Sequence, residues 1–396
     1  MKKTLDILFA AAVALVLLAA GVLTLRFGAR RTTSYYENRT LAARPTLTAQ
    51  SAWDGSYAAE AETWLSDHFP GREPLLKLDT WVQMKLLRRV VVNDTVVTGD
   101  VLLPLLTFGE YSAEAYRESV APFAEGYGKL NEWVRSHGGK LLFVGFPEQR
   151  VYFEDAFPAY LNSHKAEAKA ADDTFFEALA AQGVDCLDMR EVYDALGHGA
   201  AFYSAVDHHF HYRGAYAAYR AIMEKLAEDG RALPVLTEEK IEFKELPNPY
   251  IGSRNRKLHN LWEHAEKAEI IEQREPIGFE RFDDGAPSDK PLYVLPAEDG
   301  LPTTYNLYMG GDFGETVLKT HREDLPNALI FGDSFTNALE TLLYTAFNET
   351  RILDLRHYTE KSLKDYIAEY RPEIVIAVGN DTFYYTPSGN GAVWED

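Results

Sequence analysis

The sequence predicts an α/β fold with a doubly wound, mostly parallel sheet and helices on both faces. Short, almost purely apolar runs lie at 140–146, 329–331 and 374–378, as expected of strands that are buried on both faces. The segments between them show the apolar spacing of amphipathic helices. Such an alternation of buried strands and helices is typical of a parallel sheet covered on two sides. With 396 residues, of which 46% are hydrophobic, the chain is long enough to bury a large core.

The N-terminal residues 1–31 predict a membrane anchor or a signal segment. No charge interrupts residues 7–25, and a helix of that length would cross roughly 30 Å, the hydrocarbon core of a bilayer. We favour a retained single-pass anchor, because the run is long for a signal peptide and no clear cleavage site follows it. Positive residues flank the run on both sides, so they do not set its orientation. With the N-terminus inside the cell, all later residues would lie outside the cytoplasm.

Residues 32–100 predict a linker followed by a helical region. Apolar positions recur at helical spacing in 58–69 and 75–87, and a Pro-Gly-Arg sequence breaks the helix between them. The β-rich run 90–97 crosses Asn93-Asp94, so we expect a hairpin or an edge strand there.

The α/β domain is predicted in two parts, 101–232 and 326–396. The stretch 233–325 between them does not follow the alternation, because it is rich in Pro, Gly, Tyr and charge. We expect it to form an irregular inserted subdomain or long loops over the active edge of the sheet. The predicted helices cover 112–137, 163–182, 213–229, 335–347 and 362–369, and the predicted strands cover 140–146, 184–187, 329–331, 351–355 and 374–378.

The composition argues against several classes of function. The formal net charge of −20 disfavours binding to nucleic acid or to anionic lipid, which needs clustered Lys and Arg. The single cysteine, Cys186, cannot form a disulfide within the chain, and no Cys/His spacing suits zinc. We therefore expect no cofactor.

A serine lies where a buried strand turns into a helix. Gly332, Asp333 and Ser334 directly follow the strand predicted at 329–331, and ligands of open α/β sheets bind beyond such strand ends. The N-terminus of the next helix would favour the negative charge of a tetrahedral oxyanion. The alternative is that Asp333 and Ser334 only cap the helix, as both residue types often do.

The motif Asp207-His208-His209-Phe210 supplies the other groups that a serine nucleophile needs. A histidine takes the serine proton, and a carboxylate orients that histidine. In an extended segment, Asp207 and His209 would face the same side and His208 would turn away. Two alternatives stay open: the histidines could be surface residues without a role, or Asp207, His208, His209 and His211 could bind a metal.

The Gly-Asp-Ser block at 332–334 resembles the nucleophile block of the SGNH hydrolase superfamily. In that superfamily the serine usually lies near the N-terminus, whereas here it comes late and the histidine motif precedes it. This permuted order resembles the alginate O-acetyltransferase-like proteins and the related DHHW family. The Asp-His-Phe-Pro-Gly-Arg sequence at 67–72 and the Met-Gly-Gly-Asp sequence at 309–312 also match the family pattern, while Phe210 stands where the DHHW motif has Trp.

The resemblance implies an SGNH-like fold and a role for each candidate residue. Ser334 would be the nucleophile, His209 the general base, and Asp207 the residue that orients the base. Three aromatic residues of the irregular stretch are candidate stacking faces for a sugar ring: Trp262, Tyr305 and Tyr308. Four residues at or after predicted strands are candidates for the oxyanion hole or for substrate binding: Gly332, Arg356, Tyr358 and Asn380.

The predicted function is O-acetyl transfer to a cell-surface polysaccharide or exopolysaccharide through an acyl-serine intermediate. By resemblance, a polytopic membrane O-acyltransferase would deliver the acetyl group, since coenzyme A is not expected outside the cell. One alternative is a carbohydrate acetyl esterase with the same triad, and another is a non-catalytic polysaccharide-binding or scaffold protein. Transferase and esterase differ only in whether a sugar hydroxyl or water reaches the acyl-enzyme.

Overall fold

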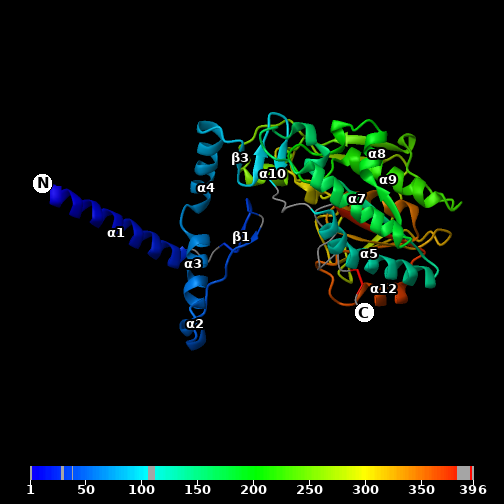
Figure 1. Ribbon diagram of the computed structural model, residues 1–396, viewed down its shortest axis with the longest axis horizontal. Coiled ribbons are helices and arrows are strands. Elements are labelled where there is room, and N and C mark those ends of the chain that lie inside the picture. The colour runs from blue at the N-terminus through cyan, green and yellow to red at the C-terminus, as the bar shows by residue number, and fades with distance from the viewer. Residues whose placement is uncertain (1, 28–30, 38, 106–111, 381–392, 395–396) are drawn as a thin grey trace. The chain divides into compact units, whose positions relative to one another are not determined.

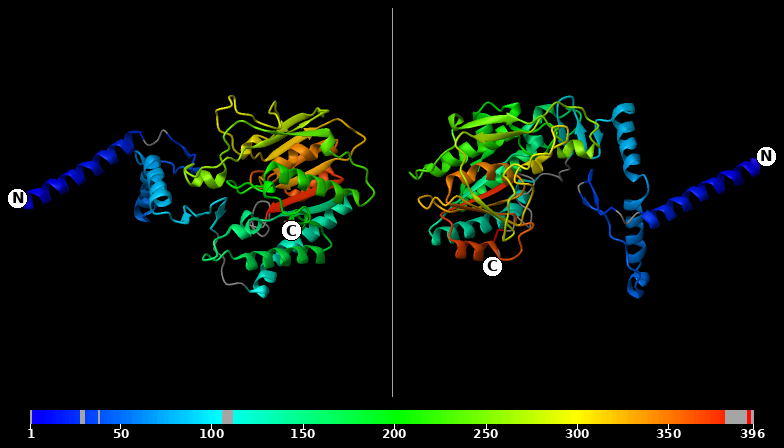
Figure 2. Two further views of the ribbon diagram at one scale, coloured as in Figure 1. Left: turned by 90° about the horizontal axis from the view of Figure 1, so that it is seen from above. Right: turned by 180° about the vertical axis from the view of Figure 1, so that it is seen from behind.

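The computed structural model describes residues 2–27, 31–37, 39–105, 112–380 and 393–394 (Figure 1). The chain divides into two compact units, which can be followed from the N-terminus to the C-terminus in the further views of Figure 2. The first unit contains Met1–Thr95 and Asn255–Glu263, and the second contains Val96–Arg254 and His264–Asp396.

The first unit begins with one long helix, α1 (Lys2–Phe27). Among the described residues it is the single helix that is long and apolar enough to cross a membrane, a property that signal sequences share. This agrees with the predicted apolar helix at the N-terminus. The other elements of this part of the chain are β1 (Thr33–Ser34), β2 (Arg39–Thr40), α2 (Ala49–Trp53), α3 (Ser56–His68), α4 (Arg72–Trp81), a π-helical turn (Val82–Leu86) and β3 (Val91–Val92).

The second unit is built on an eight-stranded sheet with the order β11-β10-β12-β14-β13-β15-β6-β7. The five strands from β14 to β7 are parallel, and the three at the other edge are antiparallel. The prediction of a mostly parallel sheet is therefore confirmed. The parallel strands are β6 (Lys140–Phe146), β7 (Asp185–Asp188), β13 (Ala328–Gly332), β14 (Glu349–Leu353) and β15 (Ile374–Asn380).

Helices cover both faces of this sheet, as the sequence predicts. On one face, alternate strand residues such as Leu141, Leu329 and Val375 share a core with α5 (Ala113–Ser136), α7 (Lys165–Ala181) and α12 (Leu363–Tyr370). The helices α8 (Met189–Ala195), α9 (Tyr212–Ala227) and α11 (Thr336–Leu343) form a second layer, in which α9 contacts both α8 and α11. The strands between these layers are buried over nearly their whole length.

Part of the stretch 233–325, predicted as an irregular inserted subdomain or long loops over the active edge of the sheet, joins the central sheet. Its strands β10 (Glu280–Asp283), β11 (Ala286–Pro287) and β12 (Glu315–Lys319) extend the central sheet beyond β14. These strands mix charged and apolar residues, because an antiparallel edge strand can face water on one side. A search for wholly apolar strands therefore misses them.

The remaining elements are short. Residues 291–294 make one isolated bridge, between Tyr293 and Tyr308. The helices α6 (Gln149–Tyr152) and α8 escape prediction because four and seven residues are too few to show a helical period. The other short elements are β4 (Thr95–Val97), β5 (Leu102–Pro104), α10 (Ser253–Lys257), and β8 (Ile241–Glu245), which pairs with β9 (Glu269–Gln273) in a separate two-stranded sheet.

Gly332 ends β13 at a point where its neighbours leave no room for a side chain. A Cβ atom on Gly332 would lie 2.5 Å from the Val378 carbonyl oxygen and 2.8 Å from Thr336 Cγ2. We expect Gly332→Ala to lower the free energy of unfolding by about 1–3 kcal/mol, because β13 must shift away from β15. Urea unfolding followed by near-UV circular dichroism measures this loss. The control is Gly278→Ala, where a Cβ would meet nothing within 4 Å; equal unfolding midpoints for both variants would contradict the expectation.

Candidate active site

The turn after β13 places Ser334 at the carboxyl end of a central strand and just before α11. Asp333 builds this turn. The Asp333 Oδ1 accepts a hydrogen bond from the Phe335 backbone N–H at 2.9 Å. The Asp333 backbone carbonyl accepts another from the Thr336 backbone N–H, also at 2.9 Å. Within the described part of the chain, the Ser334 backbone N–H donates no hydrogen bond. The Asp333 side chain therefore stabilises the turn before α11, while the Ser334 carbonyl accepts from the Asn337 N–H and the Ser334 backbone N–H has no described partner.

His209 lies on a loop that an isolated antiparallel bridge between Tyr203 and Phe210 closes. The Tyr203 hydroxyl donates a 2.6 Å hydrogen bond to the carbonyl of Pro147, which directly follows β6. The loop is thereby held at the carboxyl end of the parallel strands. Ser334 lies at the same edge, because β13 and β6 are separated by β15 alone.

A continuous series of hydrogen bonds joins Ser334, His209 and Asp207. His209 Nε2 lies 2.8 Å from Ser334 Oγ, and His209 Nδ1 lies 2.7 Å from Asp207 Oδ1. Because an ionised carboxylate only accepts hydrogen bonds, Nδ1 carries the ring proton and Nε2 is left to accept the serine proton. The structure thus brings together the three side chains selected from the sequence.

Asp207 is 2% exposed, and its surroundings keep the carboxylate ionised and oriented. Burial alone would raise its pKa, but the charges and hydrogen bonds of His209 and His208 hold that pKa well below its usual range. Two backbone N–H groups also donate to the carboxylate, that of His209 to Oδ1 at 3.1 Å and that of Ser253 to Oδ2 at 2.7 Å. Asp207 is therefore able to fix both the position and the tautomer of His209.

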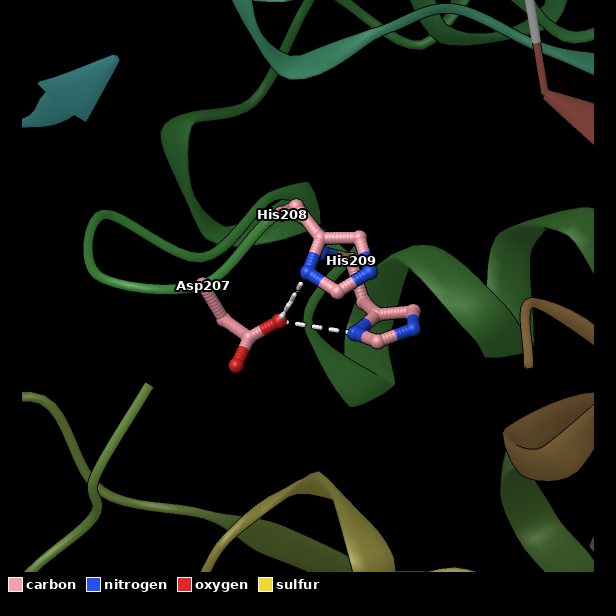
Figure 3. A group of neighbouring side chains, drawn as sticks. All are labelled: Asp207, His208 and His209. Atoms are coloured by element: carbon pink, nitrogen blue, oxygen red, sulfur yellow. Dashed lines mark hydrogen bonds and ion pairs between the residues drawn. The ribbon is translucent and has the colours of Figure 1, made fainter. Parts of the chain in front are cut away.

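His208 also points toward Asp207, which corrects the prediction that it turns away (Figure 3). Its Nδ1 lies 3.3 Å from Asp207 Oδ1 and 2.7 Å from Ser253 Oγ. The segment is bent rather than extended, because the Asp207 side chain accepts the N–H of the residue two positions later. Side chains in such a bend no longer alternate between two sides. His208 is half-exposed, whereas His209 is buried.

The metal alternative for this motif is weakened by what its donors already bind. Potential ligand atoms of Asp207, His208 and His209 lie within 4.8 Å of one another. However, the two ring nitrogens of His209 are both engaged, one by the carboxylate and the other by the serine. The fourth predicted ligand, His211, turns instead to Glu269, whose Oε2 lies 3.2 Å from its Nδ1. A metal ion would have to replace the hydrogen-bond series rather than complete it.

Burial keeps the candidate base neutral. His209 is 4% exposed, and this burial lowers the pKa of the imidazole to about 4; the charge of His208 also lowers the pKa, and Asp207 opposes both effects. At neutral pH the ring is therefore unprotonated, as a general base must be.

Tyr305 covers one face of the His209 ring. The two rings are parallel, with an interplanar angle of 2° and centroids 3.6 Å apart, and Tyr305 is 5% exposed. Tyr305 begins a 3₁₀ turn (Tyr305–Leu307) in the irregular stretch, and the sequence analysis selected it as a sugar-stacking face. Its ring is instead occupied by the imidazole, and Tyr308 likewise stacks on Tyr212. Trp262 belongs to the first unit.

The other candidate residues differ in how close they come to this site. Asn380 is buried at the end of β15, the strand next to β13, and so lies at the same edge. Arg356 donates to Asp354 from Nε at 2.9 Å and from Nη2 at 2.5 Å, and to Asp312 at 3.0 Å. Tyr358 packs edge-to-face on Tyr366 of α12 rather than against the three hydrogen-bonded side chains.

The guanidinium of Arg356 also lies at the second group of potential metal ligands, which consists of Asp312, Asp354 and His357. Its guanidinium contacts both carboxylates of this group, so a positive charge already stands where a cation would bind. The charge of Arg356 reaches toward the serine turn as well. It lowers the pKa of Asp333, although burial is the larger effect and raises that pKa to about 6.

The fold and this site form an α/β domain that resembles the SGNH type, with a hydroxyl, an imidazole and a carboxylate in series at the carboxyl ends of its parallel strands. Such a series can transfer an acyl group through the serine oxygen. The sequence signals that locate it are the Gly-Asp-Ser turn and the Asp-His-His motif.

Comparisons with known proteins agree with this class. The family model of the SGNH hydrolase-like domain of the acetyltransferase AlgX matches residues 109–281, which include Asp207 and His209 and end before Ser334. The structure of Bacillus cereus PatB1 with a sulfonyl adduct has a TM-score of 0.63 and 19% identity, with 76% of this chain and 97% of that chain covered. A DHHW family protein from Eubacterium siraeum has a TM-score of 0.56 and 17% identity, with 75% and 93% covered. No curated protein matches the chain.

These findings confirm the predicted resemblance and the SGNH-like fold. At these sequence identities the solved structures support the fold alone. The family match goes further, because it supports the prediction of an enzyme of the SGNH type, an acyltransferase or an acetyl ester hydrolase.

The low pKa of His209 predicts an unusual pH profile. We expect kcat/KM for a soluble acetyl ester to stay near its plateau at about pH 6, where an ordinary exposed histidine is largely protonated, and to fall as the pH approaches the His209 pKa of about 4. The value of kcat/KM falls toward acid pH because only the neutral ring can accept the serine proton. An initial-rate profile with purified full-length chain measures this; a half-maximal point near pH 6.5 would contradict the buried, neutral base.

Tyr305→Ala should open the covered face of His209 to water. We expect the acid limb of kcat/KM to move to higher pH by about one unit, because less desolvation lets the imidazole take up a proton more easily. Tyr305→Phe keeps the stacked ring and should keep the acid limb of the unmodified chain. If Tyr305→Ala folds and its profile superimposes on that of Tyr305→Phe, Tyr305 has no influence on the base.

Proposed function

We propose that the chain is an O-acetyltransferase that moves an acetyl group onto a polysaccharide through an acyl intermediate on Ser334. The observation that carries this proposal is the hydrogen-bond series from Ser334 Oγ through His209 to Asp207. The family match to an acetyltransferase domain supports the choice of acyl group and reaction.

In the first half of the reaction, Ser334 Oγ attacks the carbonyl carbon of the acetyl donor. His209 Nε2 takes the hydroxyl proton, and Asp207 stabilises the imidazolium that forms. The tetrahedral intermediate collapses with cleavage of the bond to the donor oxygen, which leaves with the proton from Nε2. The products of this half are the acetyl ester of Ser334 and the free donor alcohol.

The negative oxygen of the tetrahedral intermediate needs hydrogen-bond donors. The Ser334 backbone N–H is the first donor that we propose, since it lies before the first turn of α11 and donates to no described residue. Asn380 is the second, on the ground of its position at the end of the neighbouring strand. Gly332 contributes by letting β13 and β15 approach closely rather than by binding the oxygen itself.

In the second half, a sugar hydroxyl attacks the acetyl ester and gives its proton to His209 Nε2. The proton then passes to Ser334 Oγ as the acetyl ester of the sugar leaves. The net charge of −20 disfavours a polyanionic acceptor, because like charges repel at the surface. We therefore propose a neutral or amino-bearing glycan as the acceptor.

We further propose that α1 is a retained anchor and that the catalytic unit lies outside the cytoplasm. The length and apolar composition of α1 support an anchor. In that compartment, the acetyl donor would be a polytopic membrane O-acyltransferase rather than a soluble thioester.

Ser334→Ala and His209→Ala should each lower turnover of p-nitrophenyl acetate by about 10³-fold or more, because each removes a member of one hydrogen-bonded unit. The matched controls are Ser136→Ala and His321→Ala, which change exposed side chains away from the site. A sulfonyl fluoride should also label the unmodified chain on the peptide that contains Ser334, as peptide mass spectrometry would show. Full turnover in both triad variants would overturn the proposal.

The same assay separates transferase from esterase and from a metal enzyme. Neutral glycan fractions from the source organism should reduce acetate release and accumulate acetyl esters on the sugar. If acetate release is unaffected by the glycan, the chain is an esterase. A chelator should leave turnover unchanged; loss of turnover that added metal restores would establish a metal role for the histidine motif instead.

A further inference from the structure

Apart from α1, the exposed apolar side chains of the described residues are concentrated in one short segment. Outside α1, nine large hydrophobic residues between Leu47 and Leu87 are exposed. Among the described residues of the much longer second unit there are five, Tyr160, Leu196, Val294, Leu295 and Leu301. Scattered exposed apolar residues need no explanation, but a dense group usually marks an interaction surface. The nine residues are Leu47, Trp53, Leu65, Phe69, Leu75, Leu78, Trp81, Leu86 and Leu87.

Four of them form a stripe along the continuous helical segment made of α4 and the π-helical turn that follows it. Leu75, Leu78, Trp81 and Leu86 are 54%, 56%, 45% and 67% exposed, and they recur every three to five residues. The opposite side of this segment is anchored within its own unit. There Thr80 is buried, and its hydroxyl accepts a 3.0 Å hydrogen bond from Asn93. The helix is therefore amphipathic, with the apolar stripe facing outward.

Basic residues accompany the stripe. Lys77, Lys85, Arg88 and Arg89 are exposed in or directly after this helical segment, although the whole chain has a net charge of −20. A helix with Leu and Trp on one face and Lys and Arg beside them has the composition of helices that lie in the interface of a membrane. Tryptophan in particular prefers that depth.

The start of the stripe is held next to the end of α1. Arg31 follows α1 by four residues, and its Nη1 forms a 2.7 Å ion pair with Glu73 in the first turn of α4. The carbonyl oxygen of Arg31 also accepts a 3.1 Å hydrogen bond from His68 Nε2 at the end of α3. Where α1 leaves a bilayer, these contacts keep the first turn of α4 at the bilayer surface.

We propose that the stripe of Leu75, Leu78, Trp81 and Leu86 binds the outer surface of the membrane that α1 spans, with the basic side chains at the lipid headgroups. This inference rests on the proposed location of the chain. A bilayer fits better than a protein partner, because the stripe begins where the chain leaves the bilayer and carries positive charge beside it. The membrane-proximal unit would then be bound to the surface by two elements rather than by α1 alone.

The test uses full-length chain in phosphatidylcholine vesicles that contain phosphatidylglycerol. Cys186, the single cysteine, is replaced by alanine, and one new cysteine is labelled with an environment-sensitive fluorophore. The positions are Leu78→Cys in the stripe, Asp79→Cys at an exposed position outside the stripe on the same helix, and Glu239→Cys on the second unit. We expect lipids with a nitroxide near the headgroup to quench the label at 78 several-fold more strongly than those at 79 and 239. Iodide in the water phase should show the reverse order.

Each outcome decides between occupants of the stripe. If iodide quenches the label at 78 and lipid nitroxides do not, the stripe lies in water. If neither quencher reaches the label, the stripe is covered by protein. Either result overturns the proposal. A label at Ala12→Cys in α1 tests the location separately, because only a spanning helix brings it close to nitroxides deep in the acyl chains. Acetyl ester turnover of the labelled chains monitors the active site independently of both.

Discussion

The hydrogen bond between His209 Nε2 and Ser334 Oγ is the contact on which the proposed chemistry of this chain depends. It joins two loops that are 125 residues apart in the sequence. The loops meet because Tyr203 ties the first to the end of β6, while Ser334 follows β13, and β15 is the one strand between them. The order of strands in the sheet, and not closeness in the sequence, therefore brings the candidate base to the candidate nucleophile.

Burial of His209 determines the direction in which a proton can move across this contact. An imidazole in water would be partly protonated near neutral pH, whereas the burial of His209 lowers its pKa to about 4 and leaves Nε2 free to accept a proton. The Tyr305 ring lies parallel to the imidazole and covers one of its faces. The irregular stretch that carries Tyr305 thus contributes to the burial of the candidate base, although it contains none of the three hydrogen-bonded side chains.

The features that could be predicted from the sequence are those that a local pattern determines. β6 and β15 are apolar on both sides and lie within two residues of their predicted ends, and the Gly-Asp-Ser turn locates Ser334. The features that could not be predicted depend on single contacts between side chains. His208 faces Asp207 because of one hydrogen bond that bends the chain, and no local pattern singles out Tyr305 among 23 tyrosines as the one that covers His209. Tyr358 has a plausible position in the sequence but packs on Tyr366.

The same enclosure bears on whether an acyl group on Ser334 would pass to a sugar or to water. One base must serve both halves of the reaction, so any acceptor oxygen has to reach His209 Nε2. Around that nitrogen stand Tyr305, stacked on the ring, and Phe335, whose ring centroid lies 5.1 Å from that of His209. A single water molecule gains little from such an apolar setting, whereas a glycan can use contacts outside it to hold one hydroxyl in place. Enclosure of the candidate base is therefore consistent with the proposed transfer to a glycan.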